Sequence, residues 1–152
     1  MILTNLGYYH GTLLNNSQDN LLFTLLFKRQ KWLFKNLYNF DKFYIGYNIL
    51  FKLMITNQRL TSKEILFLFN SIIPVALNGH NKYKNRRGIG NIKLFFKLFS
   101  KKNIDVREYI GWGWKEPNSF LFLDSLSNYF PNLKYIHIIR NGLDMAFSGN
   151  QQ

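Results

Sequence analysis

The stretch "REYIGWGWKEPNSFLFLDSLSNYFPNLKYIHIIRNGLDMAFS", residues 107–148, decides the fold that the sequence predicts. Its first part, near 108–115, is rich in Tyr, Ile and Trp, which favour strands, and Pro117 stops the ladder. Residues 118–130 predict a helix, and the apolar run 134–139 predicts a second strand. A crossover of this length fits a parallel strand pair, so the order predicts an α/β fold.

Two cations stand at the carboxyl ends of these predicted strands. Lys115 closes the first and Arg140 closes the second, just before Gly142 and a further predicted helix. Parallel strands bring their carboxyl ends to one edge of the sheet, and adjacent strands lie about 4.8 Å apart. If the two strands are neighbours or are separated by one strand, both cations can reach one anionic ligand. Ser148, eight positions after Arg140, is expected on the following helix.

The region 19–103 is predicted to be mainly helical. The expected helices are 19–36 with Asp19 as its cap, 41–57, 61–79, a helix near 92–102, and, beyond the first strand, 118–130 capped by Asn118 or Ser119. Thr61 and Glu64 have the spacing of a capping box, Pro74 is expected to kink the third helix or end it early, and Gly46 weakens the second.

Composition predicts a single domain, residues 1–152, with enough apolar residues for a core: 47% of the chain is hydrophobic. There is no cysteine, and no metal site is visible in the sequence. No signal peptide and no apolar run of the roughly 20 residues that span a bilayer is present, so we expect a cytoplasmic protein without a transmembrane segment. The net charge of +12 would suit an anionic partner, but Lys, Asn, Ile, Phe and Tyr are all abundant and we favour a general composition bias as its main cause.

The segment "WGWKEPNSFLFLDSLSNYFPNLKYIHIIRNGLDMAFS", residues 112–148, resembles the 3'-phosphate-binding half of sulfotransferases that use 3'-phosphoadenosine 5'-phosphosulfate. In that family an Arg at a strand end and a helical Ser eight residues later hold the 3'-phosphate, and a Lys-acid-Pro step lies upstream. The matching residues here are Arg140, Asn141, Asp144 and Ser148 for the first motif, and Lys115, Glu116 and Pro117 for the second.

The resemblance implies a partial P-loop-like three-layer fold and sulfuryl transfer from 3'-phosphoadenosine 5'-phosphosulfate to a hydroxyl or amine acceptor. The acceptor, a carbohydrate, small molecule or protein, has no signature in the sequence. By resemblance Lys115 offsets charge on the leaving phosphate, while Arg140, Asn141 and Ser148 bind the nucleotide. Glu116 is the nearest carboxylate for a general base, with a purely structural role as the alternative. No metal is implied.

The N-terminal part departs from the family pattern, in which a strand, a Gly-rich loop with Lys or Arg and a helix bind the 5'-phosphosulfate. "LGYYHGTLL", residues 6–14, has glycines but no basic residue in the loop. We interpret the chain as starting inside or after the missing helix, with Gly7 as a helix terminator, rather than as a degenerate form of that loop. The expected protein is then a sulfotransferase truncated at both ends.

Two alternatives stay open. A basic nucleic-acid-binding module would use the cations of the loop "HNKYKNRRGIGN": Lys82, Lys84, Arg86 and Arg87. An inactive sulfotransferase remnant is the other. No recognisable nucleic-acid-binding motif supports the first, so we expect nucleic acid not to be the partner. Trp112 and Trp114 are expected to fill the core, and His137 to be a half-buried strand residue without a catalytic role.

Overall fold

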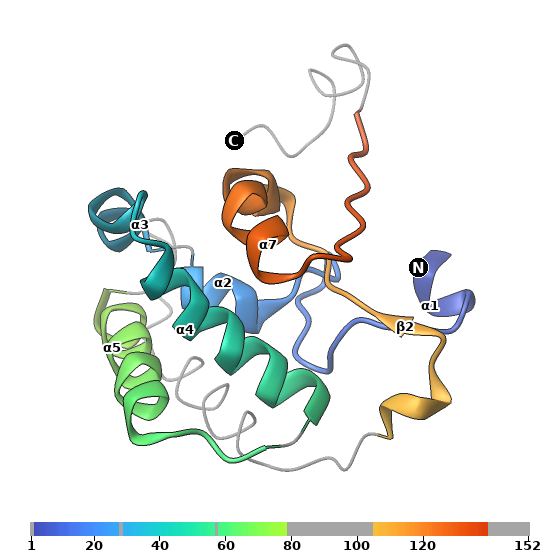
Figure 1. Cartoon of the computed structure of the whole chain (residues 1–152), viewed down its shortest axis with the longest axis horizontal. Helices are drawn as coiled ribbons and strands as arrows, with labels where there is room; N and C mark the ends of the chain where they lie inside the picture. Colours follow the sequence, from blue (N-terminus) through green and yellow to red (C-terminus); the bar gives the residue numbers. More distant parts are fainter. Residues whose placement is uncertain (1, 28, 57, 79–104, 140–152) are drawn as a thin grey trace.

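The computed structural model describes residues 2–27, 29–56, 58–78 and 105–139, and these form a mainly helical body with one small parallel sheet (Figure 1). The elements are α1 (Ile2–Asn5), β1 (Tyr8–Tyr9), α2 (Leu21–Phe27), α3 (Gln30–Asn36), α4 (Phe40–Phe51), the π-helical turn η1 (Lys52–Thr56), α5 (Ser62–Asn78), the short 3-10 helix η2 (Val106–Glu108), β2 (Gly111–Trp112), the 3-10 helix η3 (Pro117–Phe122) and α7 (Leu123–Tyr129). The prediction of mixed helix and parallel strand is confirmed at this coarse level.

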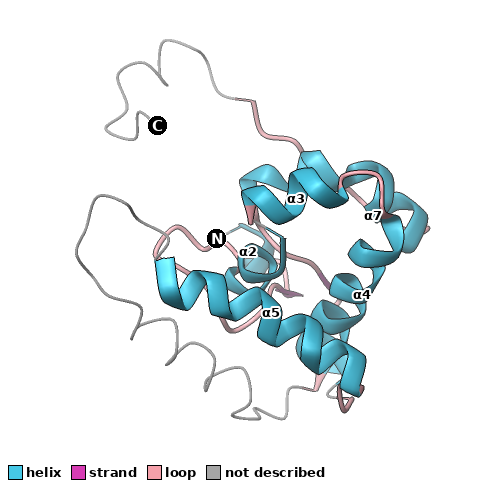
Figure 2. Ribbon diagram, turned by 90° about the vertical axis from the view of Figure 1, so that its left-hand side faces the viewer, coloured by secondary structure: helices cyan, strands magenta, loops and turns pink. Residues whose placement is uncertain are grey.

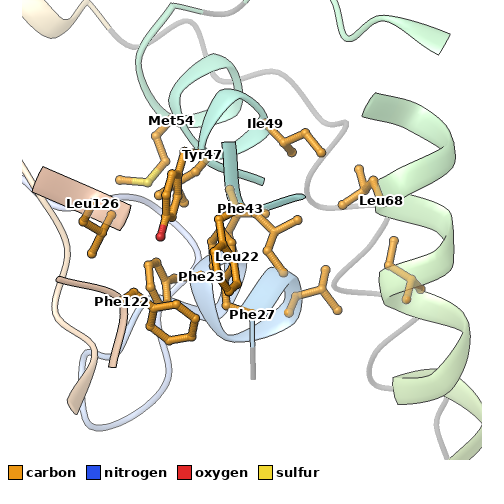
Figure 3. Packing of buried hydrophobic residues seen from close by; sticks show 14 of the residues in the cluster. Leu22, Phe23, Phe27, Phe43, Tyr47, Ile49, Met54, Leu68, Phe122 and Leu126 are labelled. Carbon is orange, nitrogen blue, oxygen red and sulfur yellow. The ribbon is translucent and has the colours of Figure 1, made fainter. Parts of the chain in front are cut away.

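The core lies among α2, α4, α5, η3 and α7, and it is dense in aromatic rings (Figures 2 and 3). Phe27 is fully buried and its ring lies 5.0 Å from that of Tyr47 and 5.5 Å from that of Phe122. The hydroxyl of Tyr47 and that of Ser125 share a hydrogen bond of 2.7 Å, which joins α4 to α7 inside the core. Burial raises the pKa of Tyr47, so this hydroxyl stays neutral and acts only as a hydrogen-bonding group.

Gly46 allows α2 and α4 to approach each other closely. A Cβ atom at this position would lie 2.6 Å from two ring atoms of Phe27, well inside van der Waals contact. The residue that weakened the helix prediction for 41–57 is thus required by packing, and α4 with η1 covers the predicted range almost completely.

The capping box at the start of α5 is confirmed. The Thr61 amide donates to Glu64 Oε2 at 2.7 Å, and the Glu64 amide donates to Thr61 Oγ1 at 3.3 Å. Lys52 adds an ion pair with the same carboxylate at 2.9 Å. These hydrogen bonds tie η1 to the first turn of α5.

Pro74 does not end α5, which continues to Asn78. Proline has no N–H, so the carbonyl of Asn70, four residues earlier, lacks its usual helical donor. The guanidinium of Arg29 donates to this carbonyl at 3.3 Å. A side chain from the α2–α3 junction therefore replaces the missing backbone hydrogen bond.

Arg29 also explains why the predicted helix 19–36 is two helices. Its backbone is extended (φ −101°, ψ 95°), so α2 and α3 are separate. The guanidinium returns to the end of α2, where Nη2 donates to the Leu26 carbonyl at 3.1 Å, and it stacks over the Trp32 ring at 4.5 Å. Three favourable contacts for one side chain outweigh the continuation of a single helix at this point.

The strands differ from the prediction in extent and partner. The first strand was expected near 108–115, but β2 contains only Gly111 and Trp112, preceded by η2. It pairs in parallel with β1, in the register Tyr8–Gly111 and Tyr9–Trp112, and not with residues 134–139. Residues 134–139 belong to no strand in the structure, because a strand needs a hydrogen-bonded neighbour and this segment has none within the described ranges.

Gly7 ends a helical turn, as predicted. Its amide donates to the Thr4 carbonyl at 3.0 Å, and its φ of +80° lies in the left-handed region that favours glycine. The basic loop with Lys82, Lys84, Arg86 and Arg87, and the helix predicted near 92–102, lie outside the described residues. None of the helices that the structure describes is long and apolar enough to cross a bilayer.

Candidate functional site

The candidate site lies at the carboxyl end of the two parallel strands. β1 leads into His10 and a loop that enters α2 at Leu21, while β2 leads through Gly113 and Trp114 to Lys115. In α/β proteins this edge of a parallel sheet is where ligands bind. The structure therefore places Lys115 beside the 10–20 loop, because β1 and β2 pair although they are far apart in the sequence.

Lys115 is held by an ion pair that the sequence analysis did not predict. Its ammonium lies 3.0 Å from Asp19 Oδ1 and also donates to the Ser17 carbonyl. Asp19 is oriented in turn by Asn15, whose Nδ2 donates to Asp19 Oδ2 at 3.0 Å. The Lys115 side chain is 48% exposed. It is accessible to a ligand, but its charge is compensated by the loop.

Asn20 fixes the distance between the loop and Lys115. The backbone amide of Asn20 donates to the Lys115 carbonyl at 2.8 Å. Its side-chain Oδ1 accepts from the backbone amide of Phe23 at 2.9 Å, in the first turn of α2. Asn20 is only 1% exposed. The helix cap is thus Asn20 and not Asp19 as predicted, which leaves the Asp19 carboxylate available to Lys115.

Glu116 faces the interior, away from the exposed ammonium of Lys115. It is buried; Oε2 accepts from Thr24 Oγ1 at 2.8 Å, and Oε1 accepts from the Asn118 amide at 3.3 Å. The second contact caps η3, so Glu116 takes the role that was predicted for Asn118 or Ser119. Its side chain joins α2 to η3 directly behind Lys115.

The two tryptophans pack at the edge of the core, as predicted. Trp114 stacks on Phe23 at 5.4 Å with an interplanar angle of 22°, and its Nε1 donates to Ser119 Oγ at 3.1 Å. Trp112 packs against Phe130 at 5.7 Å. With Trp114 and Glu116 both anchored, the backbone on each side of Lys115 is fixed, and only the Lys115 side chain extends outward.

His10 is a further polar group at the same edge of the sheet. Its Nδ1 lies 3.4 Å from Thr4 Oγ1, and its carbonyl accepts from Asn20 Nδ2 at 3.4 Å. Its Nε2 is shielded from solvent and has no hydrogen-bond partner among the described residues. His10 therefore connects α1 to the loop and lies behind Asn20.

Of the predicted site residues, the structure describes Lys115 and Glu116 and holds their backbones between the two strands and η3. Arg140, Asn141 and Ser148 lie outside the described residues, as does Asp144. The residues that the sequence analysis missed are Asp19 and Asn20. Both are good cap formers next to each other, and nothing in the local sequence distinguishes the cap from the partner of a distant lysine.

No group of three or more His, Asp or Glu side chains in the described part of the chain is arranged to hold a metal ion. Comparison with protein-family models, with curated proteins and with solved structures found no match to this chain.

Proposed function

We propose that this chain binds the 3'-phosphoadenosine part of 3'-phosphoadenosine 5'-phosphosulfate and acts in sulfuryl transfer to a hydroxyl or amine acceptor. The observation that carries the proposal is the pair of sequence motifs at two predicted strand ends, one at Lys115 and the other running from Arg140 to Ser148. The position of Lys115 at the carboxyl end of β2 supports it, because ligands of parallel sheets bind at this edge.

Lys115 supplies the positive charge at the reacting end in this proposal. Sulfuryl transfer places growing negative charge on the leaving phosphate, and an ammonium next to the bridging oxygen stabilises it. The ion pair with Asp19 must then open when the nucleotide binds, so that Lys115 exchanges a carboxylate for a phosphate oxygen. Asp19 thus sets the affinity of the edge for anions.

Arg140 and Ser148 bind the 3'-phosphate in this proposal. A planar guanidinium offers two parallel donors to a phosphate, and a serine hydroxyl eight positions later adds a third. Asn141 follows Arg140 and completes the motif.

Glu116 has a positioning role and not that of a general base. Both of its carboxylate oxygens accept hydrogen bonds from groups of the protein, and the residue is 6% exposed. A base must reach the acceptor hydroxyl, whereas this carboxylate is directed toward α2 and η3.

Titration calorimetry with adenosine 3',5'-bisphosphate and adenosine 5'-monophosphate tests the proposal. The bisphosphate should bind at least about tenfold more tightly, since each charge-assisted hydrogen bond contributes roughly 1.5 to 3 kcal/mol. Equal binding of the two nucleotides, or binding of neither, would contradict the proposal.

A further inference from the structure

Residues 134–139, directly after the turn that ends α7, form an extended apolar segment without a cover. The side chains of Ile136, Ile138 and Ile139 are 70%, 79% and 82% exposed. The rings of Tyr135 and His137 lie 5.9 Å apart, as neighbours two positions apart do on one side of an extended chain. In Figures 1 and 2 the segment leaves the helical body.

The pattern of this segment is that of a strand buried on both faces. Ile136 and Ile138 point to one side, and Tyr135 and Ile139 to the other, so each face carries large apolar groups. Such runs are typical of strands inside parallel sheets. No backbone hydrogen bond connects residues 134–139 to the rest of the described chain. Exposed isoleucines together with unpaired amides indicate a strand that lacks its neighbour.

The complementary surface is an open sheet edge. Within the described ranges the sheet consists of β1 and β2, so the edge of β2 opposite β1 has no neighbouring strand. A Cβ atom at Gly113, the residue that follows β2, would meet no other atom within 4 Å, so a side chain can be introduced there without a clash. Within the described ranges, the chain thus carries an extended segment without a paired neighbour and a sheet edge without one, and the two do not pair with each other.

We propose that two copies of this chain form a dimer by reciprocal exchange, in which residues 134–139 of each copy add to the β2 edge of the other. The turn before the segment is held by the Leu133 amide, which donates to the Phe130 carbonyl at 2.9 Å, and by Leu133 itself, which packs against the core. From this anchored turn the segment runs away from the helical body of its own copy (Figure 1), where a second copy can reach it. Each copy offers both a segment and an edge, so a twofold axis pairs the segment of each copy with the β2 edge of the other. No segment or edge of this kind is then left over, and the assembly stops at two copies. Its tests measure pairing and oligomeric state and not nucleotide binding, so its failure and the failure of the function proposed above are distinguishable.

Cross-linking tests the pairing directly, because the chain has no cysteine of its own. One variant carries Gly113→Cys, and a second, with an affinity tag that changes its mass, carries Ile138→Cys. A short bismaleimide added to the mixture should produce the heterodimer of the two variants. A third variant carries both cysteines and distinguishes pairing between two copies from pairing within one copy. Its melting temperature must equal that of the unmodified chain, which shows that it is folded. If its cross-link forms inside one chain at monomer mass, or if only Ile138→Cys copies link to each other, the exchange is wrong.

Light scattering over a range of protein concentrations tests the assembly without cysteines. The unmodified chain should be a dimer, and Ile138→Lys should raise the dissociation constant at least about tenfold, because each exchanged strand buries this side chain. The matched control is Phe34→Lys on α3, a side chain that is 76% exposed and outside the proposed interface. A monomer at every concentration, or equal effects of the two substitutions, would overturn the proposal.

Discussion

Lys115 and Asp19, which are far apart in the sequence, form an ion pair of 3.0 Å at the carboxyl end of the two parallel strands. The pair links the loop after β1 to the residue that follows β2. It also means that the cation with the clearest predicted role is already compensated by a carboxylate. An anion that binds here must compete with Asp19.

Asp19→Asn should therefore strengthen anion binding at this edge. The pair is partly exposed, with 48% of the Lys115 side chain and 18% of the Asp19 side chain accessible, and such a pair contributes about 1 kcal/mol, so the affinity for adenosine 3',5'-bisphosphate should rise by about fivefold at low salt. Calorimetry measures the change. Asp124→Asn is the control, because it removes the same charge from an exposed carboxylate on α7. Equal gains in both variants would show that net charge alone is responsible.

Arg29→Met should destabilise the fold because two backbone carbonyls lose a hydrogen-bond donor. The substitution removes the donors to Leu26 and Asn70 and the stacking on Trp32, with an expected loss of roughly 1 to 3 kcal/mol in the free energy of unfolding. Burial lowers the pKa of Arg29 to about 10, so the side chain is still charged at neutral pH. Urea unfolding measures the loss, and Arg59→Met, at an exposed position, is the control.

The same site offers a double-mutant cycle. Pro74→Ala gives position 74 an N–H that can bond the Asn70 carbonyl, so Arg29→Met should cost less in that background, by about 0.5 to 1.5 kcal/mol. Strict additivity of the two substitutions would mean that Arg29 does not replace the hydrogen bond that proline lacks.

Gly46→Ala should destabilise the packing of α2 on α4. The added methyl group would lie 2.6 Å from ring atoms of the buried Phe27, and overpacking of this kind costs about 1 to 3 kcal/mol. This loss should exceed the gain in helix propensity of up to about 1 kcal/mol. Thermal unfolding is the measurement. Gly113→Ala, where no atom of the same copy lies within 4 Å, should change the stability of the monomer by less than about 0.5 kcal/mol, measured at protein concentrations at which the chain is monomeric. A Gly46→Ala protein that melts at or above the melting temperature of the unmodified chain would contradict the close approach of α2 and α4 at this residue.

Glu64→Gln should destabilise the protein in a pH-dependent way. Burial alone raises the pKa of Glu64, but hydrogen bonds from Thr61 and Lys52 outweigh it and hold the pKa below the usual 4.5. A carboxyl with a lowered pKa in the folded state contributes stability that is present above pH 4.5 and lost as the pH falls below it. The variant should therefore lose about 1 to 3 kcal/mol at pH 7 and approach the original protein in acid. Denaturant unfolding at several pH values tests this, and a constant difference would exclude the linkage.

Local signals in the sequence predicted some helix boundaries and missed others: residues 118–130, predicted as one helix, form the 3-10 helix η3 and then α7. Thr61 and Glu64 marked the start of α5, and the structure confirms their reciprocal hydrogen bonds. The break between α2 and α3 had no such signal, because it depends on Arg29 reaching carbonyls in two helices. Pro74 was expected to disturb α5, and only the tertiary contact explains why the helix continues.

Strand pairing was less accessible because it depends on residues far apart in the chain. The sequence of β2 favoured a strand, but its partner is Tyr8–Tyr9, a two-residue element that the sequence analysis did not assign. The apolar run 134–139 has the composition of a strand without a neighbour in the described structure. Lys115 was identified by its motif, whereas Asp19, which lies against it, follows only from the fold.

The most direct test of the proposed function is the ratio of affinities for adenosine 3',5'-bisphosphate and adenosine 5'-monophosphate in Arg140→Ala. Arg107→Ala is the control, because Arg107 is exposed and pairs only with Asp105 at 2.7 Å among the described residues. If Arg140 binds the 3'-phosphate, its removal should bring the ratio close to one, while Arg107→Ala leaves the ratio of the original protein unchanged. A ratio that survives in Arg140→Ala would contradict the assignment of this arginine to the 3'-phosphate.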